Sequence, residues 1–135
     1  LAIIDPVKTG EIPEEWPRNR SLLTAPETVR VSASRPAGGD TELTLHFVNY
    51  NRIEPEKPRS PGRGIQDEKP IPVTGIRVDL PIPSGQRVAA VRFLTPEQAT
   101  SISVPFLTDA GRLTFTVPEF LVYSLVHIER TRVQP

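Results

Sequence analysis

The stretch GRLTFTVPEFLVYSLVHIE, residues 111–129, decides the fold class of this chain. Its first part alternates apolar and polar residues from Leu113 to Val117, and Pro118 then interrupts the alternation. A period of two places successive side chains on opposite faces of an extended strand, whereas a helix would need a period of 3.6 residues. The stretch therefore predicts two short β-strands, Arg112–Val117 and Leu121–Glu129.

The second of these strands is apolar on both faces. One face carries Val122, Val126 and Ile128, and the other carries Leu121, Tyr123 and Leu125. A strand of a sandwich normally has one dry face and one wet face. We therefore expect the outer face of this strand to be covered, either by the first 26 residues or by a neighbouring domain.

The same alternation recurs along the chain and predicts five further strands: Thr28–Ser34, Glu42–Tyr50, Val73–Leu80, Gln86–Thr95 and a weaker Ile102–Leu107. Pro105 cannot donate to a ladder and favours an edge position for the weakest strand. Turn residues occur at Pro83-Ser84-Gly85, and Asp109-Ala110-Gly111 predicts a hairpin. Sixteen prolines make long helices unlikely. About seven strands at this spacing predict an all-β, antiparallel two-sheet β-sandwich, immunoglobulin-like or jelly-roll-like.

Length and charge limit the possible functions. A chain of 135 residues corresponds to one domain, and its 16 basic and 16 acidic side chains cancel. This balance argues against a nucleic-acid or anionic-membrane partner, which needs a net basic face. No apolar run approaches the roughly 20 residues of a membrane span. Because the chain has no methionine and begins with Leu1, we expect it to be part of a longer protein.

Composition also predicts an internal division of the chain. Residues 1–26 read as an extended segment that packs on the domain or links it to an upstream domain. Residues 27–135 form the sandwich, with a long inserted loop at 51–72. That loop holds five prolines and a charge of only +1, from five basic and four acidic residues. We expect a solvated surface insertion, ordered at its ends by Tyr50 and Ile71, with Asn49 bonding the departing backbone. Its Pro/Arg-rich character leaves a protein-interaction role open.

The residues offer no catalytic constellation. The two histidines, His46 and His127, each fall inside a predicted strand, and no cysteine is present to complete a metal site. Two histidines together with carboxylates could in principle bind zinc, but both histidines are expected to be half-buried strand residues with polar partners. The adjacent acidic pairs, Glu14-Glu15 and Asp67-Glu68, lie in loop-like sequence and would point apart in an extended chain. We therefore predict no catalytic residues, no cofactor and no metal.

Two aromatic residues are the best candidates for contact with a ligand. Sugar rings stack on exposed aromatic side chains, and the chain has only eight aromatic residues. Trp16 lies in the segment EEWPRNR and Tyr50 lies at the mouth of the long loop. Burial against the sandwich is the favoured interpretation for both residues, and ligand contact is the alternative. Trp16 and Tyr50 are thus the predicted ligand-binding residues if the domain binds carbohydrate.

Four elements of the sequence carry a resemblance to a known family: TLHFVNYNR, IQDEKPIPVTGIRVDLPIP, VAAVRFLTPE and GRLTFTVPEFLVYSLVHIE. Together they resemble the C-terminal β-sandwich domain of bacterial glycoside hydrolases with a TIM-barrel catalytic domain, including β-galactosidase-like proteins. The matching positions are Asn49-Tyr50, Leu80-Pro81, Val91–Glu97 and Phe115–Glu129, and the resemblance covers roughly residues 25–130. The long loop departs from the family, whose members usually have a short turn after Asn-Tyr.

The resemblance implies a noncatalytic, accessory domain that supports the catalytic barrel of a glycosidase. Its partner would be the upstream catalytic domain of the same chain, with carbohydrate as a further candidate ligand, and its location extracellular or periplasmic. A carbohydrate-binding module and a protein-interaction module remain the alternatives. An independent enzyme is the least favoured reading.

Overall fold

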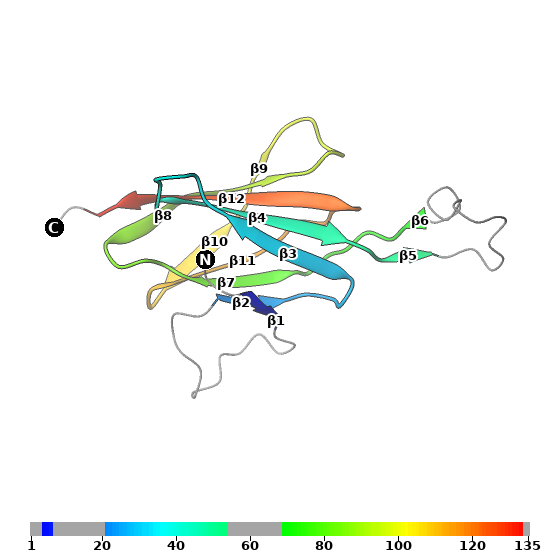
Figure 1. Cartoon of the computed structure of the whole chain (residues 1–135), viewed down its shortest axis with the longest axis horizontal. Helices are drawn as coiled ribbons and strands as arrows, with labels where there is room; N and C mark the ends of the chain where they lie inside the picture. The colour runs from blue at the N-terminus through cyan, green and yellow to red at the C-terminus, as the bar shows by residue number, and fades with distance from the viewer. Residues whose placement is uncertain (1–3, 7–20, 54–68, 134–135) are drawn as a thin grey trace.

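The computed structural model describes residues 4–6, 21–53 and 69–133 (Figure 1). These residues form twelve strands, in two five-stranded sheets and one two-stranded ribbon. The strands are β1 (Ile4–Pro6), β2 (Ser21–Thr24), β3 (Val29–Ser34), β4 (Glu42–Asn49), β5 (Arg52–Ile53), β6 (Lys69–Pro70), β7 (Arg77–Pro81), β8 (Gln86–Leu94), β9 (Ile102–Ser103), β10 (Phe106–Asp109), β11 (Arg112–Thr116) and β12 (Tyr123–Arg132). Within these three ranges, no helix is long and apolar enough to cross a membrane.

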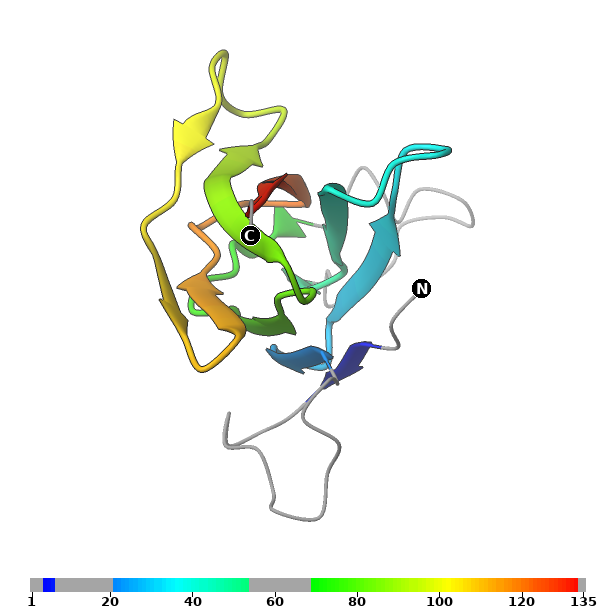
Figure 2. The ribbon, with the colours of Figure 1, turned by 90° about the vertical axis from the view of Figure 1, so that its left-hand side faces the viewer.

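The two large sheets pack as a sandwich, which confirms the predicted fold class. Sheet I has the strand order β1-β2-β7-β11-β10, and sheet II has the order β3-β4-β12-β8-β9. All pairings in them are antiparallel except that of β1 with β2. Viewed from its end, the sandwich has the chain passing between the sheets on both sides, from β2 to β3 and from β9 to β10 (Figure 2).

The alternating apolar residues fill the space between the sheets, as the sequence pattern predicts. Phe47, Phe93 and Val126 are fully buried on the inner face of sheet II. Phe120 enters the same core from the segment before β12, with its ring centroid 6.2 Å from that of Phe47 and 6.5 Å from that of Phe93. Sheet I contributes Leu113 and its neighbours from β7 and β11. The period-two pattern thus identifies most of the core directly.

The weak strand predicted at Ile102–Leu107 is two strands in different sheets. β9 pairs with β8 in sheet II, and β10 pairs with β11 in sheet I. The chain crosses between the sheets at Val104 and Pro105, where Val104 is buried and donates its N–H to the Val91 carbonyl at 2.8 Å. Both short strands lie at sheet edges, which confirms the edge position expected from Pro105.

The hairpin predicted at residues 109–111 joins β10 to β11. Ala110 and Gly111 have φ angles of 50° and 75°. Two consecutive residues with positive φ are typical of a type I′ turn, whose twist matches that of the flanking strands. Gly111 suits this left-handed conformation because it has no Cβ.

The amino-terminal strands do not cover the outer face of β12. β1 and β2 belong to sheet I, whereas β12 lies at the centre of sheet II. Strand β2 was not among the predicted strands, because SLLT is too short to show an alternation; its Leu22 and Leu23 are both buried. The domain boundary expected near residue 27 stays a prediction.

The outer face of β12 is approached instead by the connection between β8 and β9. Residues of this connection, including Pro96 and Ala99, line a cavity of about 240 Å³ together with Tyr123 and Leu125. Tyr123 and Leu125 are half-buried rather than exposed. The doubly apolar pattern of the last strand therefore has an explanation within the domain itself.

Candidate functional site

Both histidines lie on the outer face of sheet II, on the neighbouring strands β4 and β12. In the antiparallel register of these strands, Thr44 lies opposite His127 and His46 lies opposite Leu125. Side chains of one face alternate with core residues along each strand. The pairing therefore builds a polar stripe from Glu42, Thr44, His46, His127 and Glu129.

His46 has a polar partner at each ring nitrogen. Its Nδ1 lies 2.9 Å from the Tyr123 hydroxyl, and its Nε2 lies 3.1 Å from Ser34 Oγ. A neutral imidazole can offer one donor and one acceptor, and both hydroxyls can fill either role. His46 thus agrees with the prediction of a half-buried strand residue with polar partners.

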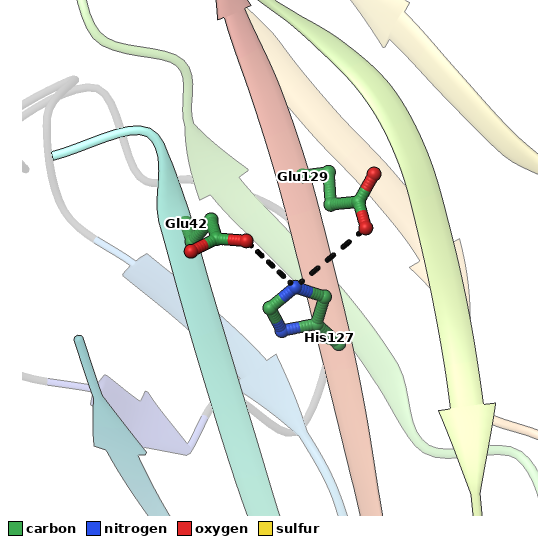
Figure 3. Close-up of side chains that lie close together, drawn as sticks. All are labelled: Glu42, His127 and Glu129. Atoms are coloured by element: carbon green, nitrogen blue, oxygen red, sulfur yellow. Dashed lines mark ion pairs between the residues drawn. The ribbon is translucent and has the colours of Figure 1, made fainter. Parts of the chain in front are cut away.

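His127 is half-buried as well, but it faces two carboxylates. Its Nδ1 lies 3.1 Å from Thr44 Oγ1. Its Nε2 lies 3.4 Å from Glu42 Oε1 and 3.8 Å from Glu129 Oε1 (Figure 3). One ligand atom from each of the three residues lies within 4.8 Å of the other two. These three residues are called the outer-face cluster below.

The outer-face cluster is better suited to hold a cation than to hydrolyse a glycosidic bond. Acid and base roles separate when two carboxylates have different surroundings. Here the side chains of Glu42 and Glu129 are similarly open, with 46% and 40% exposed. Neither residue lines the cavity beside Tyr123 or the groove on sheet I that is described below.

The acidic pairs considered in the sequence are other residues than the carboxylates of the outer-face cluster. Glu14-Glu15 and Asp67-Glu68 lie outside the described residues. The carboxylates that meet a histidine are Glu42 and Glu129, which sequence reasoning did not single out. Glu129 could have been found from the spacing His127-x-Glu129, since residues two apart share a face of a strand. Glu42 depends on the pairing of β4 with β12 and has no local signal.

Asn49 ties together the base of the long insertion. It is fully buried, and its Nδ2 donates to the carbonyl oxygens of Ile71 at 2.7 Å and Leu121 at 2.9 Å. Its Oδ1 accepts the N–H of Asn51 at 3.1 Å. The predicted bond from Asn49 to the departing backbone is therefore confirmed. Beyond it, the ribbon of β5 and β6 extends from the end of the sandwich (Figure 1).

The structure describes only one of the two aromatic residues that were predicted to bind a ligand. Trp16 lies outside the described residues. Tyr50 has 58% of its surface exposed, so the favoured prediction that it is buried is wrong. Its backbone is nevertheless fixed, because its N–H donates to the Thr28 carbonyl at 2.8 Å. Asn49, rather than the Tyr50 side chain, orders this end of the insertion.

Sheet I has a shallow groove on its outer face. Its volume is about 420 Å³, and residues of β2, β7, β10 and β11 line it, among them Leu22, Arg77, Leu107 and Thr116. Leu107 is 74% exposed and is the most exposed large apolar side chain of the described residues. Asp79 also lines the groove, and it pairs with Arg112 at 2.8 Å. The groove thus combines an apolar side chain with a satisfied ion pair.

Glu97 fastens the β8–β9 connection to the start of β12. Its Oε1 accepts the N–H of Leu121 at 2.9 Å, and its Oε2 is hydrogen-bonded to the Thr95 hydroxyl. Thr95 Oγ1 also lies 2.8 Å from the Tyr123 carbonyl oxygen. The hydrogen bond from Thr95, assisted by the Leu121 N–H, lowers the pKa of Glu97 below its ordinary value of 4.5 against the opposing effect of burial.

The variant Glu97→Gln is expected to be less stable than the wild type at neutral pH. A carboxylate whose pKa is lowered by folding stabilises the native state above the unfolded pKa, and this stabilisation is lost as the pH falls through the folded pKa. The difference in melting temperature should therefore shrink below about pH 4.5. Thermal melts of both proteins between about pH 7 and pH 3 test this. A difference that stays constant over this range would contradict the role of the charge.

Comparisons with known proteins give structural matches alone. No protein-family model matches the chain, and no curated protein is significantly similar in sequence. One similar solved structure is alpha-L-fucosidase isoenzyme 2 from Paenibacillus thiaminolyticus, with a TM-score of 0.59 and 19% identity over 83% of this chain and 15% of that one. Another is a cycloisomaltooligosaccharide glucanotransferase from Paenibacillus sp., solved with cycloisomaltoheptaose, with a TM-score of 0.52 and 20% identity over 76% of this chain and 14% of that one.

These matches show that the fold of this chain also occurs in those two proteins, where it makes up a small part of the chain. At such identities the likeness shows a shared fold alone. This chain spans about one seventh of the length of each matched protein. In both, a sandwich of this kind occurs as a small part of a much larger carbohydrate-active enzyme.

Proposed function

We propose that this chain is a noncatalytic accessory domain of a carbohydrate-active enzyme, in which it supports an upstream catalytic domain. The observation that carries the proposal is the extent of the structural matches, which cover most of this chain but 15% and 14% of two such enzymes. A domain with this share of a larger enzyme leaves ample length for a separate catalytic domain. An extracellular or periplasmic location goes with this proposal.

The chemistry of the described surface supports a noncatalytic role. Hydrolysis of a glycosidic bond uses two carboxylates that flank a bound sugar. The carboxylates of Glu42 and Glu129 lie near each other on an open sheet face, with a histidine between them. Glu97 and Asp79 are each occupied by hydrogen bonds or an ion pair within the domain.

The outer face of sheet I is the surface best suited to a contact with the catalytic domain. Domain interfaces within a chain are more polar than obligate interfaces, but they still bury apolar side chains. Leu107 offers such a side chain, and it is flanked in the groove by the threonines of β11. Leu107 lies on β10, an edge strand of sheet I. A domain that approaches the side of the sandwich would therefore contact Leu107 first.

Two measurements test the accessory role. The purified 135-residue chain is expected to release no 4-nitrophenol from a panel of 4-nitrophenyl glycosides. Removing these residues from the protein expressed from the full-length reading frame should lower the melting temperature of the remaining enzyme by several degrees, because an interdomain contact is lost. Turnover by the isolated chain, or an unchanged melting temperature after the deletion, would reject the proposal.

A carbohydrate-binding module is the second candidate, and the exposure of Tyr50 favours it. An aromatic residue that is 58% exposed on a fixed backbone can serve as a platform for a sugar. Affinity electrophoresis through a panel of polysaccharides distinguishes the two functions. Retardation of the wild type that is lost in Tyr50→Ala would support carbohydrate binding. If no glycan changed the migration of the wild type, carbohydrate binding would be rejected and the accessory role would be the remaining function.

A further inference from the structure

We propose that the outer-face cluster of Glu42, His127 and Glu129 is a binding site for a divalent cation of the zinc class. The site goes beyond the proposed accessory function and does not depend on it. It joins strands β4 and β12 at the centre of sheet II (Figure 3). Three observations carry the proposal: the spacing of the ligand atoms, the orientation of the imidazole and the placement of the two carboxylates.

The spacing of the ligand atoms suits a small tetrahedral ion. Zinc binds histidine nitrogen and carboxylate oxygen at about 2.0–2.2 Å, so tetrahedral ligand atoms lie about 3.3–3.6 Å apart. His127 Nε2 lies 3.4 Å from Glu42 Oε1 and 3.8 Å from Glu129 Oε1. A rotation of the partly exposed Glu129 side chain would close the second distance. Three protein ligands would leave the fourth position to water.

The imidazole is oriented by a second hydrogen bond. Histidines that bind metals generally use their other ring nitrogen to donate to a nearby oxygen, which fixes the tautomer and the ring orientation. His127 Nδ1 lies 3.1 Å from Thr44 Oγ1, and Thr44 lies directly opposite it in the β4–β12 register. With the proton on Nδ1, the lone pair of Nε2 points toward the two carboxylates.

The two carboxylates occupy a position that is unfavourable without a cation. Glu42 lies directly opposite Glu129 in the register. Like charges at directly opposed positions destabilise a sheet, and a divalent ion between them would reverse this effect. On the other side of β12, Ala90 lies opposite Glu129 and Arg92 opposite His127. In the described part of the chain, Arg92 makes no ion pair with either carboxylate.

The register of β12 changes at this site. The pairing with β8 shifts between Glu129 and Arg130, which marks a bulge or irregularity. The extra residue is Ala89 of β8, so β12 keeps its own alternation through Arg130. Bulges are frequent next to functional sites. Arg130 itself turns inward and is buried, with its Nη2 donating to the Asp40 carbonyl at 2.9 Å. Glu129 is therefore the last outward-facing residue before the irregularity.

The composition of the chain allows a matched control. The sequence has two histidines and no cysteine, so His46 is the only other strong nitrogen or sulfur ligand for zinc. His46 lies on the same face of the same sheet, but its ring nitrogens meet the hydroxyls of Tyr123 and Ser34 rather than carboxylates. The variants His127→Gln and His46→Gln thus separate the proposed site from general binding to histidine.

The experiment is isothermal titration of the tag-free, EDTA-treated chain with ZnCl2. We expect saturable binding of one ion per chain, weakened at least roughly tenfold in His127→Gln and in Glu129→Gln, and unchanged in His46→Gln. Thr44→Val should weaken binding by roughly tenfold without removing a ligand. Visible absorption after CoCl2 addition should have the high intensity of a four-coordinate ion in the wild type and lose it in His127→Gln.

Three results would overturn the proposal. They are an absence of saturable zinc binding, zinc binding that is the same in His127→Gln as in the wild type, and an equal loss of binding in His46→Gln. Thermal melts of each variant without metal establish that it is folded. If His127→Gln does not fold, the near-isosteric Glu42→Gln and Glu129→Gln variants decide between the outcomes in the same way.

Discussion

Asn49→Asp is expected to lower the free energy of unfolding by about 3 kcal/mol or more, since a buried polar group left without its partner costs about 1–3 kcal/mol. The change keeps the shape of the side chain but removes both N–H donors. The carbonyl oxygens of Ile71 and Leu121 would then face a carboxyl group in a site with no exposure. Urea denaturation, with the free energy extrapolated to water, measures this effect.

The control for this prediction is Gln98→Glu, which makes the same amide-to-carboxylate change on an exposed side chain. Surface changes of this kind usually alter stability by less than about 0.5 kcal/mol. If Asn49→Asp lost no more stability than Gln98→Glu, the hydrogen bonds of Asn49 would not be what joins β4 to the segments before β7 and β12. An equal loss in both variants would point to net charge instead.

Phe47→Ala is expected to destabilise the domain by about 3–5 kcal/mol, the usual range for removing a buried aromatic ring. Phe47 has no exposed surface. Its ring lies next to the ring of Phe120, which also lies next to the ring of Phe93. These three rings meet where sheet II is joined to the segment entering β12. The cavity left by the ring could not be refilled without moving both sheets.

Leu107→Ala is the matched control for the core variant. It also shortens a large apolar side chain, but Leu107 is 74% exposed, so its loss should change stability by less than about 0.5 kcal/mol. Thermal melts of Phe47→Ala and Leu107→Ala under the same conditions compare the two positions. Similar melting temperatures for both variants would mean that the sandwich core can repack around a missing ring.

The strands of the sandwich were predictable because the inward positions alternate strictly. In β4 and β12 the buried residues Leu45, Phe47, Val126 and Ile128 are separated by polar or half-buried ones. The sequence did not predict which sheet each strand joins, because alternation is the same in either. The run from Ile102 to Leu107 shows this: one apolar pattern is divided between two sheets at Pro105.

The polar sites were predictable only in part, for a related reason. Asn49 could be assigned a structural role because it stands at a strand end before a long insertion, and its hydrogen bonds confirm this. His127 was predicted only to be a half-buried strand residue with polar partners. Glu42 was not singled out, since it meets His127 through a pairing of strands that are distant in sequence. Trp16 was predicted from local sequence and lies outside the described residues.

The anchoring of the insertion by Asn49 has a consequence for how the chain can vary. Asn49 fixes both backbone segments at the base, and Arg52 and Ile53 pair with Pro70 and Lys69 beyond it. Once the two ends of a connection are held, each doubling of its length adds only about 0.6 kcal/mol to the entropic cost of closing it. The site between Ile53 and Lys69 should therefore accept a foreign domain, or new chain termini in a circular permutant, while the sandwich keeps its fold.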